Sequence, residues 1–146
     1  MNVVICKETS ANSWEDVLKK CSTALSDKGL VKDTFFKGCY DRELVFPTGL
    51  QFSCGVAIPH TDSIHVNETS ICFMKLNDPV VFKSMEDIED EVSVSLVFML
   101  AISDSGDHIS FLSKIINLLK EKDFLDTCLS LNENEISDFL YSSIIN

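Results

Sequence analysis

The spacing of apolar side chains predicts two helices in the N-terminal third of the chain. The first helix has an apolar stripe made of Trp14, Val17, Leu18, Cys21 and Leu25. These positions recur at intervals of three and four, the period of a helix with one buried face. Ser13 suits the N-cap with Asp16 three residues later, and Gly29 suits the end of the helix. A second helix is predicted over residues 33–44, before Pro47 and Gly49, with a stripe of Phe36, Cys39, Tyr40 and Leu44.

The middle of the chain changes to the period of strands. Strands are predicted over residues 55–58, 69–76, 80–83 and 92–102. In the last of these, apolar and polar residues alternate before the run becomes wholly apolar, which is typical of a strand that passes from half-buried to fully buried. Helices are then predicted over residues 108–122, 123–129 and 133–144. This order predicts an α/β domain in which helices cover a sheet, and it leaves the strand order open.

Length and charge narrow the choice of partners. The 146 residues suit one domain, and 45% apolar residues suffice for a sizeable core. The net charge of −11 is unevenly placed: residues 1–60 hold seven basic and seven acidic side chains, whereas residues 61–146 hold five and sixteen. Acidic surfaces repel phosphate backbones and anionic lipids. The charge therefore disfavours nucleic-acid and membrane-surface roles and favours a basic protein partner.

Apolar runs and cysteines indicate a cytosolic protein. The longest apolar run, residues 96–102, is too short to span a bilayer, and no basic segment followed by a long apolar stretch predicts a signal peptide. Six cysteines contain no C-x-x-C pair, and no Cys/His pair has the spacing of zinc ligands. Because the chain is long for a secreted disulfide framework, we expect buried, reduced thiols.

Three side chains are candidates for chemistry. His60 follows Pro59 where a strand meets a loop, which is a usual place for ligands in an open α/β sheet. His108 begins a helix, where free N–H groups favour anions. Arg42 is the single arginine of the chain, and its planar fork of donors suits a phosphoryl group. Taken alone, His60 is most simply a half-exposed turn residue, His108 an ordinary residue at a helix start and Arg42 a charge on a helix surface.

Other sites are open on the residues alone. His60 and His65 are five residues apart and suit a small metal site, and Cys54 with His60 suits a nucleophile pair. The acidic run over residues 86–91 predicts a solvated loop on which a basic partner could dock. Glycine-rich phosphate loops, G-x-S-x-G and H-E-x-x-H are absent from the sequence.

A family resemblance joins the candidates together. Phe46-Pro47-Thr48-Gly49-Leu50, followed by Gly55-Val56-Ala57-Ile58-Pro59-His60-Thr61, resembles the enzyme IIA domains of the fructose–mannitol class in the bacterial sugar phosphotransferase system. The sequence of these two segments is most similar to that of the galactitol-type component. The resemblance spans nearly the whole chain and implies a single domain over residues 1–146, with a mixed β-sheet flanked by helices on both faces.

The resemblance also implies roles and partners. His60 corresponds to the phospho-acceptor, His108 to a hydrogen-bond donor to the phosphate, and Arg42 to the residue that orients it. Phospho-HPr would be the donor and a cysteine of enzyme IIB the acceptor, with the membrane component IIC downstream and no cofactor or metal. Because both partners are proteins, we expect His60 to be exposed on a shallow apolar surface. A regulatory protein whose phosphorylation state is sensed would carry the same motifs.

Overall fold

Five strands form one mixed sheet in the computed structural model, which describes residues 1–145. The strands are β1 (Asn2–Ile5), β2 (Gly49–Gln51), β3 (Gly55–Ala57), β4 (Ser70–Lys83) and β5 (Glu91–Ala101). Their order across the sheet is β1-β4-β5-β3-β2. β1 pairs with β4 and β3 with β5 in parallel, whereas the pairs β4–β5 and β2–β3 are antiparallel. The predicted mixed sheet is confirmed.

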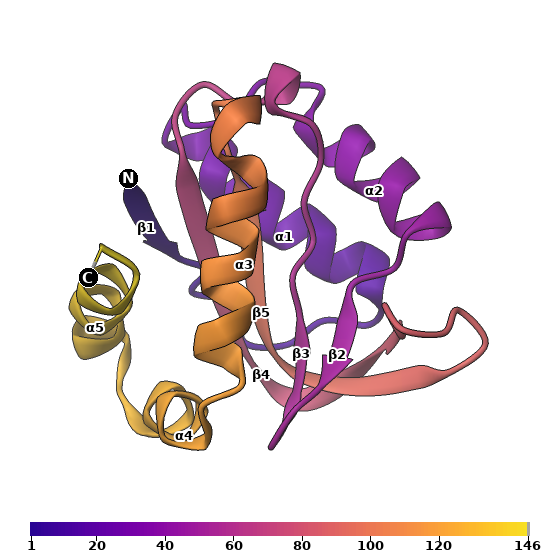
Figure 1. Cartoon of the computed structure of the whole chain (residues 1–146), viewed down its shortest axis with the longest axis vertical. Helices are drawn as coiled ribbons and strands as arrows, with labels where there is room; N and C mark the ends of the chain where they lie inside the picture. The colour runs from indigo at the N-terminus through magenta and orange to yellow at the C-terminus, as the bar shows by residue number, and fades with distance from the viewer. Residues whose placement is uncertain (146) are drawn as a thin grey trace.

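Helices cover both faces of this sheet, as predicted (Figure 1). α1 (Trp14–Asp27) and α2 (Phe35–Val45) pack on one face, and α3 (His108–Leu119), α4 (Lys122–Ser130) and α5 (Glu133–Ile145) on the other. Successive side chains of β5 enter the two cores in turn, so this strand is buried on both sides along its apolar end. Within residues 1–145 no helix has the length and apolar character needed to cross a membrane.

The ends of α1 form as their residue types predict. The Ser13 side chain accepts a hydrogen bond from the Asp16 N–H at 3.2 Å. Gly29 has a φ of 71°, the left-handed conformation that a side chain disfavours. The Gly29 N–H donates to Ser26 O and the Leu30 N–H to Leu25 O, the paired bonds of a Schellman motif.

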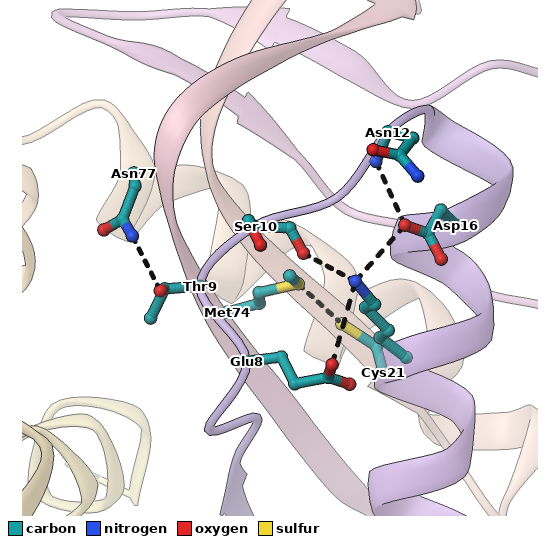
Figure 2. Close-up of polar contacts among 9 residues, drawn as sticks. Glu8, Thr9, Ser10, Asn12, Asp16, Cys21, Met74 and Asn77 are labelled. Carbon is teal, nitrogen blue, oxygen red and sulfur yellow. Dashed lines mark hydrogen bonds and ion pairs between the residues drawn. The ribbon is translucent and has the colours of Figure 1, made fainter.

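Lys20 ties the segment that leads into α1 to this helix, through Ser10 and Asp16, which are labelled in Figure 2. The Lys20 ammonium group donates to Ser10 O at 2.8 Å and forms an ion pair with Asp16 at 3.3 Å. At the start of the helix Trp14 stacks on Tyr40 of α2, with ring centroids 5.4 Å apart. This contact packs α2, the helix that contains Arg42, against α1.

The structure differs from the predicted elements in three respects. β1 and β2 were not predicted, and the two strands expected over residues 69–76 and 80–83 are one strand, β4, with an irregularity in its pairing between Lys75 and Val80. The buried face of α2 consists of Phe35, Cys39 and Glu43. Leu44 of the predicted stripe is 53% exposed, because the helix turns Glu43 inward to meet Thr48.

Candidate functional site

His60 and His108 meet at one edge of the sheet. β3 and β5 are parallel neighbours, so their carboxyl ends lie at the same edge, where α/β proteins commonly bind ligands. His60 lies three residues after the end of β3, and His108 begins α3 after a short 3₁₀ turn (Ser105–Asp107) that follows β5. Their ring centroids are 5.4 Å apart in an edge-to-face arrangement. The structure therefore brings these two candidates together.

The His60 ring is buried, and the expectation that it is exposed is wrong. His60 is only 4% exposed, because the end of α2, the turn before β2 and the start of α3 close around the end of β3. Its Nδ1 lies 2.7 Å from Ile58 O. A carbonyl oxygen can only accept, so Nδ1 carries the proton, and Nε2 is the ring nitrogen with a free lone pair.

Burial also sets the charge of His60. The pKa of His60 is lowered to about 4, chiefly because the ring is removed from water. The nearby Arg42 and His108 contribute to the lowering, and the bond to Ile58 O and the carboxylate of Asp62 oppose it. His60 is therefore neutral at pH 7, with a lone pair available for nucleophilic attack.

Arg42 reaches the same site from the last turn of α2. It lines a cavity of about 350 Å³ together with His60. Its Nε is buried and has no hydrogen-bond partner within the described residues 1–145, and its guanidinium carbon lies 5.4 Å from the centroid of the Phe46 ring. An unpaired buried donor of a guanidinium group is suited to an anion, because such groups are normally hydrogen-bonded. Most of the cavity wall is apolar and consists of Val45, Phe46, Pro47, Met85, Ile88 and Leu112.

Glu43 and Thr48 belong to the site, although the sequence analysis gave them no role. Glu43 is 6% exposed, and its two carboxylate oxygens accept from the Thr48 N–H at 2.7 Å and the Thr48 hydroxyl at 2.8 Å. Burial raises the pKa of Glu43 to about 7, and the bonds from Thr48 and the charge of Arg42 oppose the rise. One signal was available: Glu43 is four residues after Cys39, on the same helix face.

The remaining candidates lie elsewhere. The Nδ1 of His65 is 2.7 Å from the hydroxyl of Thr34, on the side of α2. Cys54 is half-buried, and burial raises its pKa, with Asp126 of α4 adding to the rise, which disfavours a reactive thiolate. The other five thiols are buried. No group of three His, Cys, Asp or Glu side chains suited to a metal ion occurs in the part of the chain that the structure describes.

The acidic run borders the cavity of His60. It occupies the turn between β4 and β5, where Met85 and Ile88 line the cavity and Glu86, Asp87, Glu89 and Asp90 are exposed. Val45 and Phe46, which also line the cavity, are each 61% exposed. The mouth of the cavity therefore combines exposed apolar side chains with a group of acidic ones, an arrangement suited to a protein partner.

Sequence comparison places these residues in a known context. The model of the family "phosphoenolpyruvate-dependent sugar phosphotransferase system, EIIA 2" matches residues 1–143. The galactitol-specific EIIA component of Escherichia coli K12 is 27% identical over 131 residues, 89% of this chain and 87% of that protein. The mannitol-specific enzyme IIA component of Staphylococcus aureus is 30% identical over 129 residues, 86% and 83% of the two chains.

Solved structures share the fold. Enzyme IIA in the mannitol complex of enzyme IIA with phosphorylated enzyme IIB from Escherichia coli superposes with a TM-score of 0.75 at 22% identity, covering 94% of each chain. The nitrogen regulatory protein IIA-Ntr from Neisseria meningitidis gives a TM-score of 0.71 at 20% identity, covering 97% of this chain and 91% of that one. At 20–22% identity, this structural similarity shows that the fold is shared.

Proposed function

Because the chain belongs to the EIIA 2 family of the phosphoenolpyruvate-dependent sugar phosphotransferase system, we propose that it carries a phosphoryl group on His60 between two proteins. Phospho-HPr donates the group, and a cysteine of a cognate enzyme IIB accepts it in the cytoplasm. The membrane component IIC then takes up a sugar or sugar alcohol of the galactitol type. The observation that carries the proposal is the His60 ring, neutral and held by Ile58 O, beside the unpaired Nε of Arg42.

The reaction balances as two displacements at phosphorus. The lone pair of His60 Nε2 attacks the phosphorus of phospho-HPr, the new N–P bond forms, and the bond to the HPr nitrogen breaks. A thiolate of enzyme IIB then attacks the same phosphorus, an S–P bond forms, and His60 leaves as neutral imidazole. Throughout both steps the proton stays on His60 Nδ1, which donates it in a hydrogen bond to Ile58 O.

The surrounding groups stabilise the transferring phosphoryl group by position and charge. Phosphoryl transfer has a loose, anionic transition state, so alignment and positive charge contribute most of the catalysis. Arg42 supplies the cation in the cavity that it lines together with His60. His108 supplies a donor beside the His60 ring, at the N-terminus of α3, where the helix dipole also favours an anion.

The mouth of the cavity supplies the docking surface for both partners. Its exposed apolar side chains, Val45, Phe46 and Ile88, exclude water when a partner binds. The acidic turn at residues 86–90 attracts a basic carrier protein and speeds its approach. The buried position of His60 requires the partner's phosphohistidine to reach into the cavity.

Labelling by phospho-HPr tests the proposal. The wild-type chain is mixed with labelled phospho-HPr, and the modified residue is mapped under conditions that preserve acid-labile phosphate. We expect label on His60, none on His60→Gln, and loss of the label to a galactitol-type enzyme IIB when that protein is added. A wild-type chain that takes no label contradicts the proposal, and a labelled His60→Gln variant contradicts the choice of acceptor.

A regulatory role is the second candidate, because the fold is also that of IIA-Ntr. Such a protein accepts the phosphoryl group in the same way, and a partner senses the difference between the two forms. The enzyme IIB step distinguishes the two: label that reaches His60 but passes to no enzyme IIB favours regulation.

A further inference from the structure

Glu43 is a buried acid that the transfer reaction itself does not use. It is 6% exposed in the last turn of α2, although the next three residues of the chain are all exposed. A buried carboxylate is costly unless its oxygens are hydrogen-bonded, so its place needs a reason. We propose that Glu43 is a positioning residue that holds His60, through Thr48 and Ile58, in the tautomer and place needed for phosphoryl transfer. The inference rests on the proposed function of His60.

A continuous set of hydrogen bonds connects Glu43 to the His60 ring. The carboxylate accepts both the N–H and the hydroxyl of Thr48, at 2.7 and 2.8 Å. The carbonyl of Thr48 accepts from the Ile58 N–H at 3.3 Å. The carbonyl of Ile58 accepts from His60 Nδ1 at 2.7 Å. Thr48, Ile58 and His60 are all buried, so water does not replace these bonds when one is lost.

The last bond decides which nitrogen attacks. The proton stays on Nδ1 only while Ile58 O remains in place, and the position of Ile58 depends on Thr48. Glu43 holds Thr48 at two points, which limits both translation and rotation of this residue. The same contact closes the turn that carries Phe46 and Pro47, part of the cavity wall. A displacement of about 1 Å in such a site can slow a reaction about a hundredfold.

The two donors of Thr48 favour a carboxylate at position 43. Thr48 presents two donors, and an ionised carboxylate offers two acceptors. Glutamine has nearly the same shape, but its NH₂ group is a donor. The Thr48 hydroxyl then has to accept rather than donate, and the Thr48 N–H is left with a neutral amide oxygen, a weaker acceptor than a carboxylate. Glu43→Gln therefore changes the hydrogen bonding with little change in volume.

The experiment compares Glu43→Gln, Thr48→Val and Thr48→Ser with the wild-type chain. Asp41→Asn is the matched control, because Asp41 is an exposed acid on the same helix that forms an ion pair with Lys37. Three quantities are measured: ring ¹⁵N shifts of His60 for the tautomer, the thermal midpoint for stability, and kcat and KM for transfer from phospho-HPr. For Glu43→Gln we expect kcat to fall at least about tenfold with KM nearly unchanged, and His60 to lose its single Nδ1–H tautomer.

Thr48 supplies the rescue. Thr48→Val keeps the shape and removes the hydroxyl bond, so we expect kcat to fall, whereas Thr48→Ser keeps the bond and the wild-type kcat. A folded Glu43→Gln variant with the wild-type tautomer and kcat overturns the inference. If Glu43→Gln does not fold, equal kcat values for Thr48→Val and Thr48→Ser overturn it. The ¹⁵N measurement needs no partner, so a tautomer change in a chain that accepts no phosphoryl group contradicts the proposed function and leaves the positioning role standing.

Discussion

His60 and His65 are five residues apart, and the fold gives them different chemistry. His60 is 4% exposed and donates from Nδ1 to the carbonyl of Ile58, beside Arg42 and His108. His65 is half-buried, and its Nδ1 faces the hydroxyl of Thr34 at 2.7 Å. A carbonyl only accepts, whereas a hydroxyl donates or accepts. The partner of His60 therefore selects one tautomer, and the partner of His65 permits both.

The largest expected effect is the contrast between the two histidines as phosphoryl acceptors. We expect His60→Gln to lose labelling by phospho-HPr by about a thousandfold or more, because the nucleophile is gone. His65→Gln should stay within about twofold of the wild type, since its ring contacts Thr34 rather than the cavity. Initial rates of label incorporation measure both. A comparable loss of labelling in His65→Gln would mean that His60 and His65 act as one site.

The pH dependence of stability tests the burial of His60. The folded-state pKa of His60 is about 4 against an ordinary value of 6.5, so the unfolded chain binds more protons between these values. Stability from this residue is complete above pH 6.5 and falls as the pH drops toward 4, by about 3 kcal/mol in all. Glu43 acts in the opposite direction, because its pKa is raised to about 7, so the wild-type curve alone mixes two effects.

The comparison with His60→Gln separates these two effects. Urea unfolding of both proteins between about pH 4 and about pH 7 gives the difference curve, which should rise with pH through the His60 window. Parallel curves for the two proteins would show that His60 is not shielded from water in solution.

Arg42 sharpens the contrast on the side of charge. We expect Arg42→Gln to slow transfer about a hundredfold, the usual cost of removing one donor that stabilises transition-state charge. Its free energy of unfolding should stay within about 0.5 kcal/mol of the wild type. Lys37→Gln is the matched control, because Lys37 is an exposed cation on the same helix that pairs with Asp41. Loss of the folded state in Arg42→Gln would mean that the residue is structural.

The smallest expected effect concerns the acidic turn beside the His60 cavity. Raising the salt concentration from about 50 to about 500 mM should slow transfer from phospho-HPr severalfold, because salt screens charge attraction. Glu86→Gln with Asp87→Asn should weaken this dependence. The control pair, Glu135→Gln with Asp138→Asn, removes two exposed acids from α5, which covers the β1 edge of the sheet. A rate independent of salt would limit the acidic turn to a role in solubility.

Local patterns predicted the elements whose signals lie within a few residues. The Ser13 cap, the Gly29 stop and the long apolar strand β5 all formed as expected. β1 and β2 were missed because they have only four and three residues, and β1 pairs with β4 through partners such as Asn2 and Ser70, far apart in the sequence. Pairing over such distances has no local periodicity to detect.

Residue type and position in the sequence selected the candidate residues, whereas the geometry of the candidate site comes from the fold. His60, His108 and Arg42 could be selected from residue type and position, and the structure places them around one strand end. Burial of His60 and of Glu43 was not predicted. The burial of each side chain depends on segments from separate elements of the chain that pack over it. The apolar pattern of one segment does not indicate which other segment will cover it.

The sequence by itself determined the α/β class, the helix ends, the acidic half of the chain and the resemblance that selected His60. Only the tertiary structure decided that His60 is buried, that Nδ1 rather than Nε2 carries its proton, and that His65 belongs to another corner. The physical reason is that the tautomer of a histidine depends on its hydrogen-bond partner, which is Ile58 O for His60 and the Thr34 hydroxyl for His65. The lowered pKa of His60 comes chiefly from its burial, and strand pairing and helix packing produce both the burial and the partners.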